Sequence, residues 1–424
     1  MIYVALVFLL AGMVLFRSPL FSTLSLPEQS TSLAFGFLLL FAFLGGKIIQ
    51  RLKLPRITGY LLAGMICGPY ILKLLQTSDV RDFQLFDGLA LSLIALTAGG
   101  EMKLSGIKKR IGTISSLVLM QSVFIIVGFL AIGFFLKPYI PFVAQMTVAQ
   151  NTAVWLLLGT LATATSPSTT IAVINETGAK GPVSDLVLAT AVFKDFFIIV
   201  FFAFALSFSR VLMESGTGFD LGFLLNILRD IGGSLLIGGA VGAAVILYLR
   251  FIQRDITLFI LGVAFFTYQI SHHHGFHPLL ICLLAGFLVE NYSPHGDRLI
   301  QAIEKSSLPV YVVFFAISGA SLDLNALRSV WPLALLLVVW RGGLKFVGTS
   351  VGAGISGEDP LVRRLAWSGF ISQAGVALGM AIVIERTFPG WGGTFKTIVL
   401  AVIAINQVIG PILLQKMIYR IGEA

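Results

Sequence analysis

The sequence predicts an all-α polytopic membrane protein of about 14 transmembrane helices, arranged as two inverted repeats with crossed broken helices. Composition is the first reason, because 57% of the 424 residues are hydrophobic and only 12% are charged, about half the charged share of soluble domains. The second reason is that apolar segments long enough to cross a bilayer follow one another with short linkers. The third is that two of these segments, in matching positions of the two halves, are interrupted by glycine, proline and hydroxyl residues.

Each expected span is an apolar segment between polar linkers. In chain order the spans are 2–16, 32–50, 56–75, 86–100, 113–136, 151–175, 182–207, 223–250, 255–271, 276–291, 306–321, 328–353, 362–385 and 395–419. Residues 1–16 are interpreted as a retained helix rather than a signal peptide, because Arg17 and Pro19 follow instead of a small-residue cleavage site. Cys67 and Cys282 lie inside spans, which indicates free thiols.

The basic residues predict the orientation. When the linkers are assigned alternately to the two sides, about 17 Lys and Arg residues fall on one side and about 8 on the other. The positive-inside rule then places both termini in the cytoplasm, which requires an even number of spans. The net charge of +9 comes from these scattered linker residues, so a nucleic-acid partner is not expected.

The two interrupted spans indicate an internal repeat. Span 151–175 is interrupted at Thr165-Ser-Pro-Ser168 and span 362–385 at Ser372-Gln-Ala-Gly375, and one further span follows each of them. If the interruptions cross, the ends of the half-helices face each other and form a polar cavity in an apolar shell. The residues expected at this crossover are Pro167, Ser168, Gln373 and Gly375.

The repeats divide the chain as follows. We expect a first inverted repeat over 1–210, which includes an extra N-terminal helix, a connecting helix at 223–250, and a second repeat over 255–420.

Asp195 is the most informative single residue, because it lies near the centre of the apolar span 182–207. A charge at that depth costs at least a few kcal/mol. A buried carboxylate beside an interrupted helix is how ion-coupled transporters build a cation site. The alternative is a structural ion pair between packed helices.

Three basic residues accompany Asp195 at this depth. Lys194 directly precedes it, and span 328–353 carries Arg341 and Lys345, which are four residues apart and share one helix face. A buried lysine usually pairs with a carboxylate, and Asp195 is the only acid at comparable depth. The alternative for Arg341 is to neutralise backbone carbonyl groups or to extend to the membrane interface.

Several segments, taken in order, resemble those of a known family. They are 51–69, 93–102, 165–170 with Glu176, 275–286, 345–348 and 373–379. They resemble the monovalent cation:proton antiporter superfamily, in its bacterial branch of sodium/proton antiporters and potassium efflux systems. The resemblance implies a homodimer in which a core domain moves against a dimerisation domain in elevator-like alternating access. It also implies that Asp195 is the essential ion-binding aspartate, with Thr165, Ser166 and nearby carbonyl groups completing the site.

Lys194 departs from the family pattern, in which Asp or Asn usually stands directly before the essential aspartate. In members with two aspartates, the first pairs with the helix lysine, which is Lys345 here. Three arrangements are open: Lys345 pairs with Asp195, one lysine is neutral because burial disfavours its charged form, or Lys194 points elsewhere. The last is open because adjacent helix residues diverge by about 100°.

These residues predict a secondary active antiporter in which Asp195 binds either Na⁺ or K⁺, or a proton, in competition. A single carboxylate predicts electroneutral exchange, whereas a lysine that releases its proton would make exchange electrogenic. The expected partners are the cation, H⁺, membrane lipids and a second copy of the chain. No cofactor and no metal besides the transported cation is expected. The expected location is the bacterial inner membrane, with a role in pH homeostasis.

Two other functions remain open. The local excess of positive charge around Asp195 favours an anion or organic-acid transporter on the same fold. The other function is that of a sensor or channel subunit in which the presence of Lys194 has abolished transport. An enzyme is not expected, because the sequence contains no nucleophile–base arrangement.

The remaining polar residues have modest expected roles. The cluster of His272, His273, His274 and His277 is interpreted as a polar loop cap on the outer face, with pH sensing or metal binding as the alternative. Glu101 and Glu176 are interpreted as solvated helix ends, and Asn406 and Gln407 as buried groups that hydrogen-bond between helices.

Overall fold

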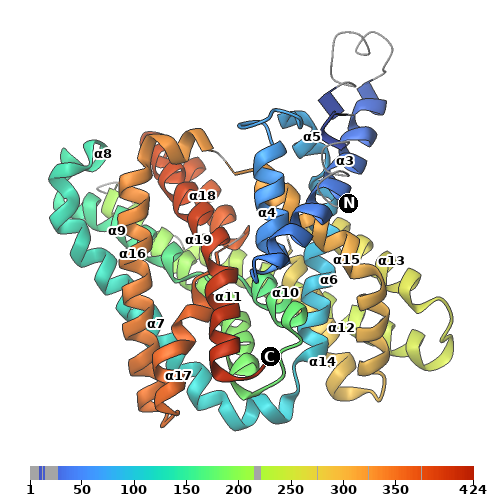
Figure 1. Cartoon of the computed structure of the whole chain (residues 1–424). Helices are drawn as coiled ribbons and strands as arrows, with labels where there is room; N and C mark the ends of the chain where they lie inside the picture. The colour runs from blue at the N-terminus through green and yellow to red at the C-terminus, as the bar shows by residue number, and fades with distance from the viewer. Residues whose placement is uncertain are drawn as a thin grey trace. The chain divides into compact units, whose positions relative to one another are not determined.

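The computed structural model describes residues 9–11, 13–14, 27–213, 221–274, 276–322, 324–373 and 375–424. Within these ranges every regular element is a helix (Figure 1), so the all-α prediction is confirmed for the described residues. Most of the expected span 2–16 lies outside them.

The chain forms two compact units, each made from two separate segments. The first unit comprises the described parts of 1–103 and 233–323, and the second comprises those of 104–232 and 324–424. Each unit therefore takes one segment from each half of the chain. The inverted repeats over 1–210 and 255–420 stay a prediction.

The first unit is a set of packed helices. They are α3 (Pro27–Arg51), α4 (Arg56–Cys67), α5 (Thr77–Asp82), α6 (Gln84–Glu101), α13 (Ile256–His274), α14 (Pro278–Tyr292), α15 (Gly296–Ala320) and the part of α12 (Leu221–Phe251) that begins at Gly233. Helices α6 and α14 pack most closely at Gly99 and Gly286. A Cβ atom on Gly99 would lie 2.0 Å from the carbonyl oxygen of Leu283, so this contact requires glycine. Small residues at such contacts are typical of membrane helices.

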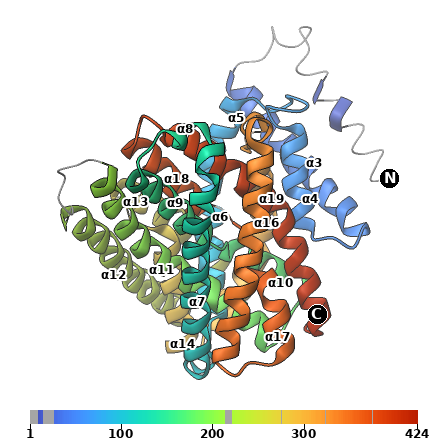
Figure 2. The same ribbon diagram turned by 90° about the vertical axis from the view of Figure 1, so that its left-hand side faces the viewer.

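The second unit contains the broken helices. Its elements are α7 (Leu104–Leu136), η1 (Lys137–Tyr139), α8 (Pro141–Ala144), α9 (Val148–Thr163), α10 (Pro167–Thr177), α11 (Pro182–Met213), α16 (Leu324–Ile355), α17 (Pro360–Leu365), η2 (Ala366–Phe370), α18 (Gly375–Thr387) and α19 (Gly392–Ile421). Figure 2 shows α7 and α16 side by side, and they share one of the largest helix contacts of this unit. An apolar core that includes Phe129, Trp155 and Phe395 surrounds the broken helices.

Helix α11 begins against the C-terminal end of α19. The backbone N–H groups of Val183 and Ser184 donate to the carboxylate of Glu423 at 2.8 and 2.7 Å, and the Ser184 hydroxyl donates to it at 2.6 Å. The first N–H groups of a helix have no partner within the helix, and they lie at its positive end. Glu423 therefore caps the helix that carries Asp195.

Seven helices of the described chain are long and apolar enough to cross a membrane, or up to eight if α15, which bends by 60°, counts as one span. The protein is therefore a multi-pass membrane protein. Each expected span from 32–50 onward coincides with a helix or a broken pair, and several of these helices are shorter than 18 residues. The total of 14 spans stays a prediction. The expected span 56–75 is too long, because Gly68 and Pro69 end α4 at Cys67.

Candidate functional site

The first broken helix is formed by α9 and α10. Helix α9 ends at Thr163, and α10 begins at Pro167, whose fixed φ suits the first position of a helix. Ser166 caps α10, because its hydroxyl accepts a hydrogen bond from the N–H of Thr169 at 3.2 Å. The hydroxyls of Ser166 and Ser168 lie 3.0 Å apart. The break is therefore a buried polar segment.

The second broken helix is formed by η2 and α18. The 3₁₀-helix η2 ends at Phe370, residues 371–373 are not helical, and α18 begins at Gly375. The Gln373 amide bonds in two directions: it donates to the carbonyl of Leu161 at 3.0 Å and accepts from the Asn406 amide at 2.8 Å. Asn406 thus joins α19 to the second break.

The two breaks are in direct contact. The backbone N–H of Ser166 donates to the carbonyl of Ser372 at 2.9 Å, and the Thr165 hydroxyl lies 3.3 Å from the carbonyl oxygen of Phe370. Thr165, Ser166 and Ser372 are each at most 3% exposed. The two segments that contain the residues expected at the crossover are therefore in contact: Pro167 and Ser168 lie in one, and Gln373 and Gly375 lie in the other.

Arg341 joins the two breaks through backbone carbonyl groups. Its guanidinium donates to Ala162 and Ala164 at the end of α9, both at 2.7 Å, and to Ile371 after η2 at 2.8 Å. Carbonyl groups at a helix end carry partial negative charge and have no partner within the helix. The contacts match the alternative in which Arg341 neutralises backbone carbonyls, and the side chain is completely buried.

Lys345 lies one turn further along α16 and contacts the same breaks. Its Nζ donates to the Thr165 hydroxyl at 2.7 Å, to the carbonyl of Ala164 at 3.2 Å and to that of Phe370 at 2.5 Å. Neutral oxygen atoms therefore satisfy this buried ammonium group.

Lys194 and Asp195 are adjacent on α11 and have different surroundings. The Lys194 Nζ donates to Gln121 Oε1 on α7 and lies 5.5 Å from the centre of the Phe370 ring. Asp195 is 8% exposed, and its Oδ1 atom is buried without a hydrogen-bond partner. Among the described residues, Asp195 has no ion pair with Lys345 and no hydrogen bond with Thr165 or Ser166.

Of the three arrangements left open by the sequence, these contacts match the one in which Lys194 points elsewhere. Lys345 does not pair with Asp195 in this structure but bonds to the broken helices.

Gln121 and Thr349 are site residues that the sequence analysis did not single out. Gln121 is completely buried on α7, and its amide nitrogen donates to the Thr349 hydroxyl on α16 at 3.0 Å. The available signal was a single amide side chain inside the apolar span 113–136. Nothing in its sequence position indicates Lys194 as its partner.

The predicted histidine cluster belongs to the first unit. The rings of His273 and His274 pack edge to face, with their centres 4.9 Å apart, and His277 occupies the N-cap position of α14. The described residues contain no group of three or more His, Cys, Asp or Glu side chains that could hold a metal ion. Glu176 lies near the end of α10, whereas the side chains of Glu101 and His272 lie outside the described part of the structure.

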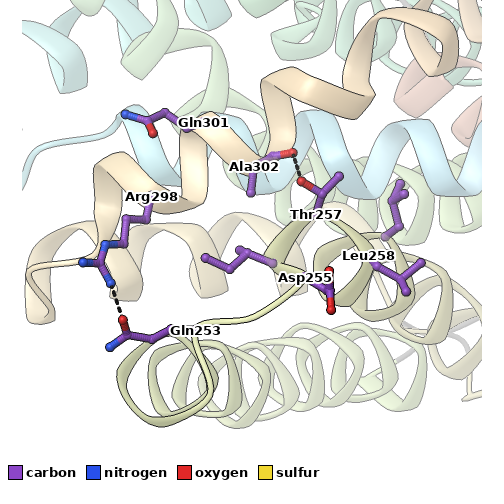
Figure 3. A pocket seen from close by; sticks show the side chains of 9 residues that line it. Gln253, Asp255, Thr257, Leu258, Arg298, Gln301 and Ala302 are labelled. Carbon is purple, nitrogen blue, oxygen red and sulfur yellow. Dashed lines mark hydrogen bonds between the residues drawn. The ribbon is translucent and has the colours of Figure 1, made fainter.

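The first unit also contains a cavity of about 700 Å³ between the loop before α13 and the start of α15 (Figure 3). Arg298 points to Gln253 and donates to its amide oxygen at 3.0 Å, while the Thr257 hydroxyl donates to the carbonyl of Ala302 at 3.3 Å. None of the predicted site residues lines this cavity.

The second unit thus contains two broken helices in contact with each other. Two basic side chains donate to the carbonyl groups at the breaks, and one carboxylate has an oxygen atom without a hydrogen-bond partner. Crossed broken helices around a buried ionisable group form the core that ion-coupled secondary transporters share. The fold and the site therefore place the protein in the class of secondary transporters.

Comparison with known proteins narrows this class. Residues 37–418 match the family model described as "Sodium/hydrogen exchanger, transmembrane". The chain belongs to this family, and its resemblance in sequence to the monovalent cation:proton antiporter superfamily is confirmed. Cation/proton exchange is accordingly the class of function that its relatives support.

Two relatives are similar over most of their length. The chain is 24% identical over 390 residues to the Na(+)/H(+)-K(+) antiporter GerN of Bacillus cereus, with 89% of this chain and 93% of GerN covered. It is 23% identical over 376 residues to Na(+)/H(+) antiporter 1 of Methanocaldococcus jannaschii, with 83% and 84% covered.

Solved structures show the same fold. A structure of the sodium proton antiporter MjNhaP1 from Methanocaldococcus jannaschii matches with a TM-score of 0.70 at 20% identity, covering 92% of this chain and 95% of that one. A second structure of MjNhaP1, at pH 8, matches with a TM-score of 0.64 at 19% identity, covering 92% and 96%.

Proposed function

We propose that the protein exchanges a monovalent cation, Na⁺ or K⁺, for protons across the bacterial inner membrane, and that Asp195 is the carboxylate both ions share. One observation carries the proposal: Asp195 Oδ1 is buried and unpartnered, while Lys194, Arg341 and Lys345 are bonded to neutral oxygen atoms. A buried carboxylate oxygen without a donor is unfavourable, and either a proton or a cation satisfies it. Because one oxygen atom serves both ions, occupancy by one excludes the other.

The names of the relatives indicate Na⁺ and K⁺ as candidate cations. The name of GerN includes both Na⁺ and K⁺, and that of the archaeal relative includes Na⁺. Both cations are bound by carboxylate, hydroxyl and carbonyl oxygen atoms, and Asp195 and the two breaks contain all three kinds. We therefore keep both as candidate substrates, with Thr165, Ser166 and carbonyl groups of the breaks as further ligands once Lys345 shifts.

The stoichiometry follows from the number of titrating groups. Among the described residues of the second unit, Asp195 is the only buried carboxylate, and Lys194, Arg341 and Lys345 are held as donors to neutral oxygen atoms. If these donors keep their protons during exchange, one cation moves for one proton and the exchange is electroneutral.

The architecture suggests how access alternates. We assign the second unit as the moving core and the first as the dimerisation unit of a homodimer, with both chain termini in the cytoplasm. The proposal is supported by the location of Asp195, both breaks and all three basic residues in one compact unit.

The experiment is dissipation of an imposed pH gradient in proteoliposomes on addition of Na⁺, K⁺ or Li⁺. Wild type should respond to at least one cation, and Asp195→Asn should not. Asp185→Asn, on the exposed first turn of the same helix, is the matched control and should behave as wild type. An imposed membrane potential should not change the rate. Full exchange by Asp195→Asn would refute the proposal.

A second candidate is an anion transporter on the same fold, because the described part of the second unit buries three basic residues and one carboxylate. Its substrate would need the donors that now bind the carbonyl groups of the breaks. Dissipation that depends on the anion and not on the cation would select this function.

A further inference from the structure

The contact between α7 and α16 holds Gln121 in a fixed place. A Cβ atom on Gly348 would lie 2.7 Å from the Cα atom of Gln121, so the two backbones touch here. Hydrogen bonds flank this point on both sides, from the Ser116 hydroxyl to the carbonyl of Gly352 at 2.9 Å and from the Trp340 indole to that of Gly128 at 3.1 Å. The backbone of Gln121 therefore cannot move without separating the helices.

The amide of Gln121 is also fixed in orientation. Its nitrogen donates to the Thr349 hydroxyl at 3.0 Å, which leaves the oxygen to face Lys194. An amide has one accepting and one donating end, so a reversed amide would turn its own donors to the ammonium group. Thr349 thus determines that Gln121 accepts from Lys194.

Lys194 needs this acceptor, because it is 1% exposed and directly precedes Asp195. A buried ammonium group without an acceptor is strongly unfavourable. If Gln121 were absent, the neighbouring carboxylate, with its unpaired Oδ1, would be the strongest acceptor for the flexible lysine side chain.

We propose that Gln121 is a positioning residue that holds the Lys194 ammonium on α7 and so keeps Asp195 open to the transported cation. The inference rests on the proposed function of Asp195. Without Gln121, Lys194 becomes an internal cation that competes with the substrate. Only molecules in which Asp195 is open bind the cation, so the apparent KM rises as the fraction of open molecules falls. If Lys194 pairs with Asp195 in nine of ten molecules, the apparent KM is about tenfold higher.

The test compares the cation KM and the maximal rate of exchange in proteoliposomes. Gln121→Met keeps the length of the side chain and removes the acceptor, and should raise KM about tenfold with a smaller change in the maximal rate. Gln121→Glu keeps an acceptor for Lys194 and should keep KM within about twofold of wild type. In the Gln121→Met background, Lys194→Met should return KM towards the wild-type value, because no ammonium group remains to compete.

Two results would overturn the proposal. One is a Gln121→Met protein with wild-type KM, and the other is a raised KM that persists when Lys194→Met is added. If Gln121→Met does not fold, Thr349→Val carries the test: it removes the group that orients the amide and should raise KM severalfold, whereas an unchanged KM contradicts the proposal. If the wild-type protein exchanges no cation at all, the proposed antiport function is refuted. This result is distinct from failure of the proposed role of Gln121, in which the wild type exchanges cations but the variants do not behave as expected.

Discussion

Arg341 and Lys345, one turn apart on α16, both donate to the carbonyl oxygen of Ala164, at 2.7 and 3.2 Å. This oxygen lies where the first broken helix ends. Arg341 also donates to the carbonyl of Ile371 and Lys345 to that of Phe370, so each side chain binds the second break as well. The polar crossing is therefore held by side chains of a third helix rather than by the broken helices alone.

Arg341→Met should destabilise the protein strongly. The change removes three hydrogen bonds and leaves Ala164 with Lys345 as its remaining side-chain donor, and each hydrogen bond to a charged group contributes about 1.5–3 kcal/mol. We expect a lower midpoint of thermal unfolding in detergent. Arg328→Met is the matched control, because Arg328 lies exposed on the same helix and should change stability by less than about 0.5 kcal/mol. Equal midpoints for the two variants would contradict this role of Arg341.

A double-mutant cycle on unfolding free energy should couple Lys345 to Thr165 rather than to Asp195. The Lys345 Nζ lies 2.7 Å from the Thr165 hydroxyl, and contacting residues couple by about 0.5–3 kcal/mol. We expect about 1 kcal/mol for Lys345→Met with Thr165→Val. Lys345→Met with Asp195→Asn should be nearly additive, and a larger coupling in this second cycle would indicate an ion pair.

Gly348→Ala and Gly343→Ala form a matched pair on one helix. A Cβ atom at Gly348 would meet the Cα atom of Gln121 at 2.7 Å, whereas one at Gly343 has no atom within 4 Å. Gly348→Ala should therefore force α7 and α16 apart, lowering thermal stability and raising the cation KM through Gln121. Gly343→Ala should change stability by less than about 1 kcal/mol. Wild-type stability and KM in both variants would show that the close contact is not required.

Glu423→Gln should loosen the start of α11. The carboxylate accepts from the N–H groups of Val183 and Ser184, and a charged cap at a helix N-terminus contributes about 0.5–2 kcal/mol. Faster amide hydrogen exchange over residues 182–186 would report the loss. As a control, Glu385→Gln removes a partly exposed ion pair with Lys396 and should leave this exchange unchanged.

Much of the fold follows from residue patterns, because membrane helices must be long and apolar and their interruptions contain polar, glycine or proline residues. The spans from 32–50 onward, both breaks and the burial of Asp195 could be predicted for this reason. For Arg341, contact with backbone carbonyl groups was one expected alternative, but the particular carbonyl groups could not be predicted, because backbone acceptors carry no residue-type signal.

Gln121 and Thr349 illustrate the same limit for side chains. A single amide or hydroxyl in an apolar span indicates a buried hydrogen bond but not its partner. That partner depends on which helices pack together, and here it lies 228 residues away along the chain.

The contacts of Arg341 also have a consequence for biogenesis. The guanidinium group that satisfies Ala162 belongs to a helix synthesised 179 residues later. At about 5–20 residues per second, the first broken helix waits on the order of ten seconds or more for its donor. During that time its carbonyl ends require another partner, because lipid provides no hydrogen-bond donors. Completion of the proposed ion site is therefore a late step in assembly, and chains truncated before α16 should be retained by the insertion machinery or degraded.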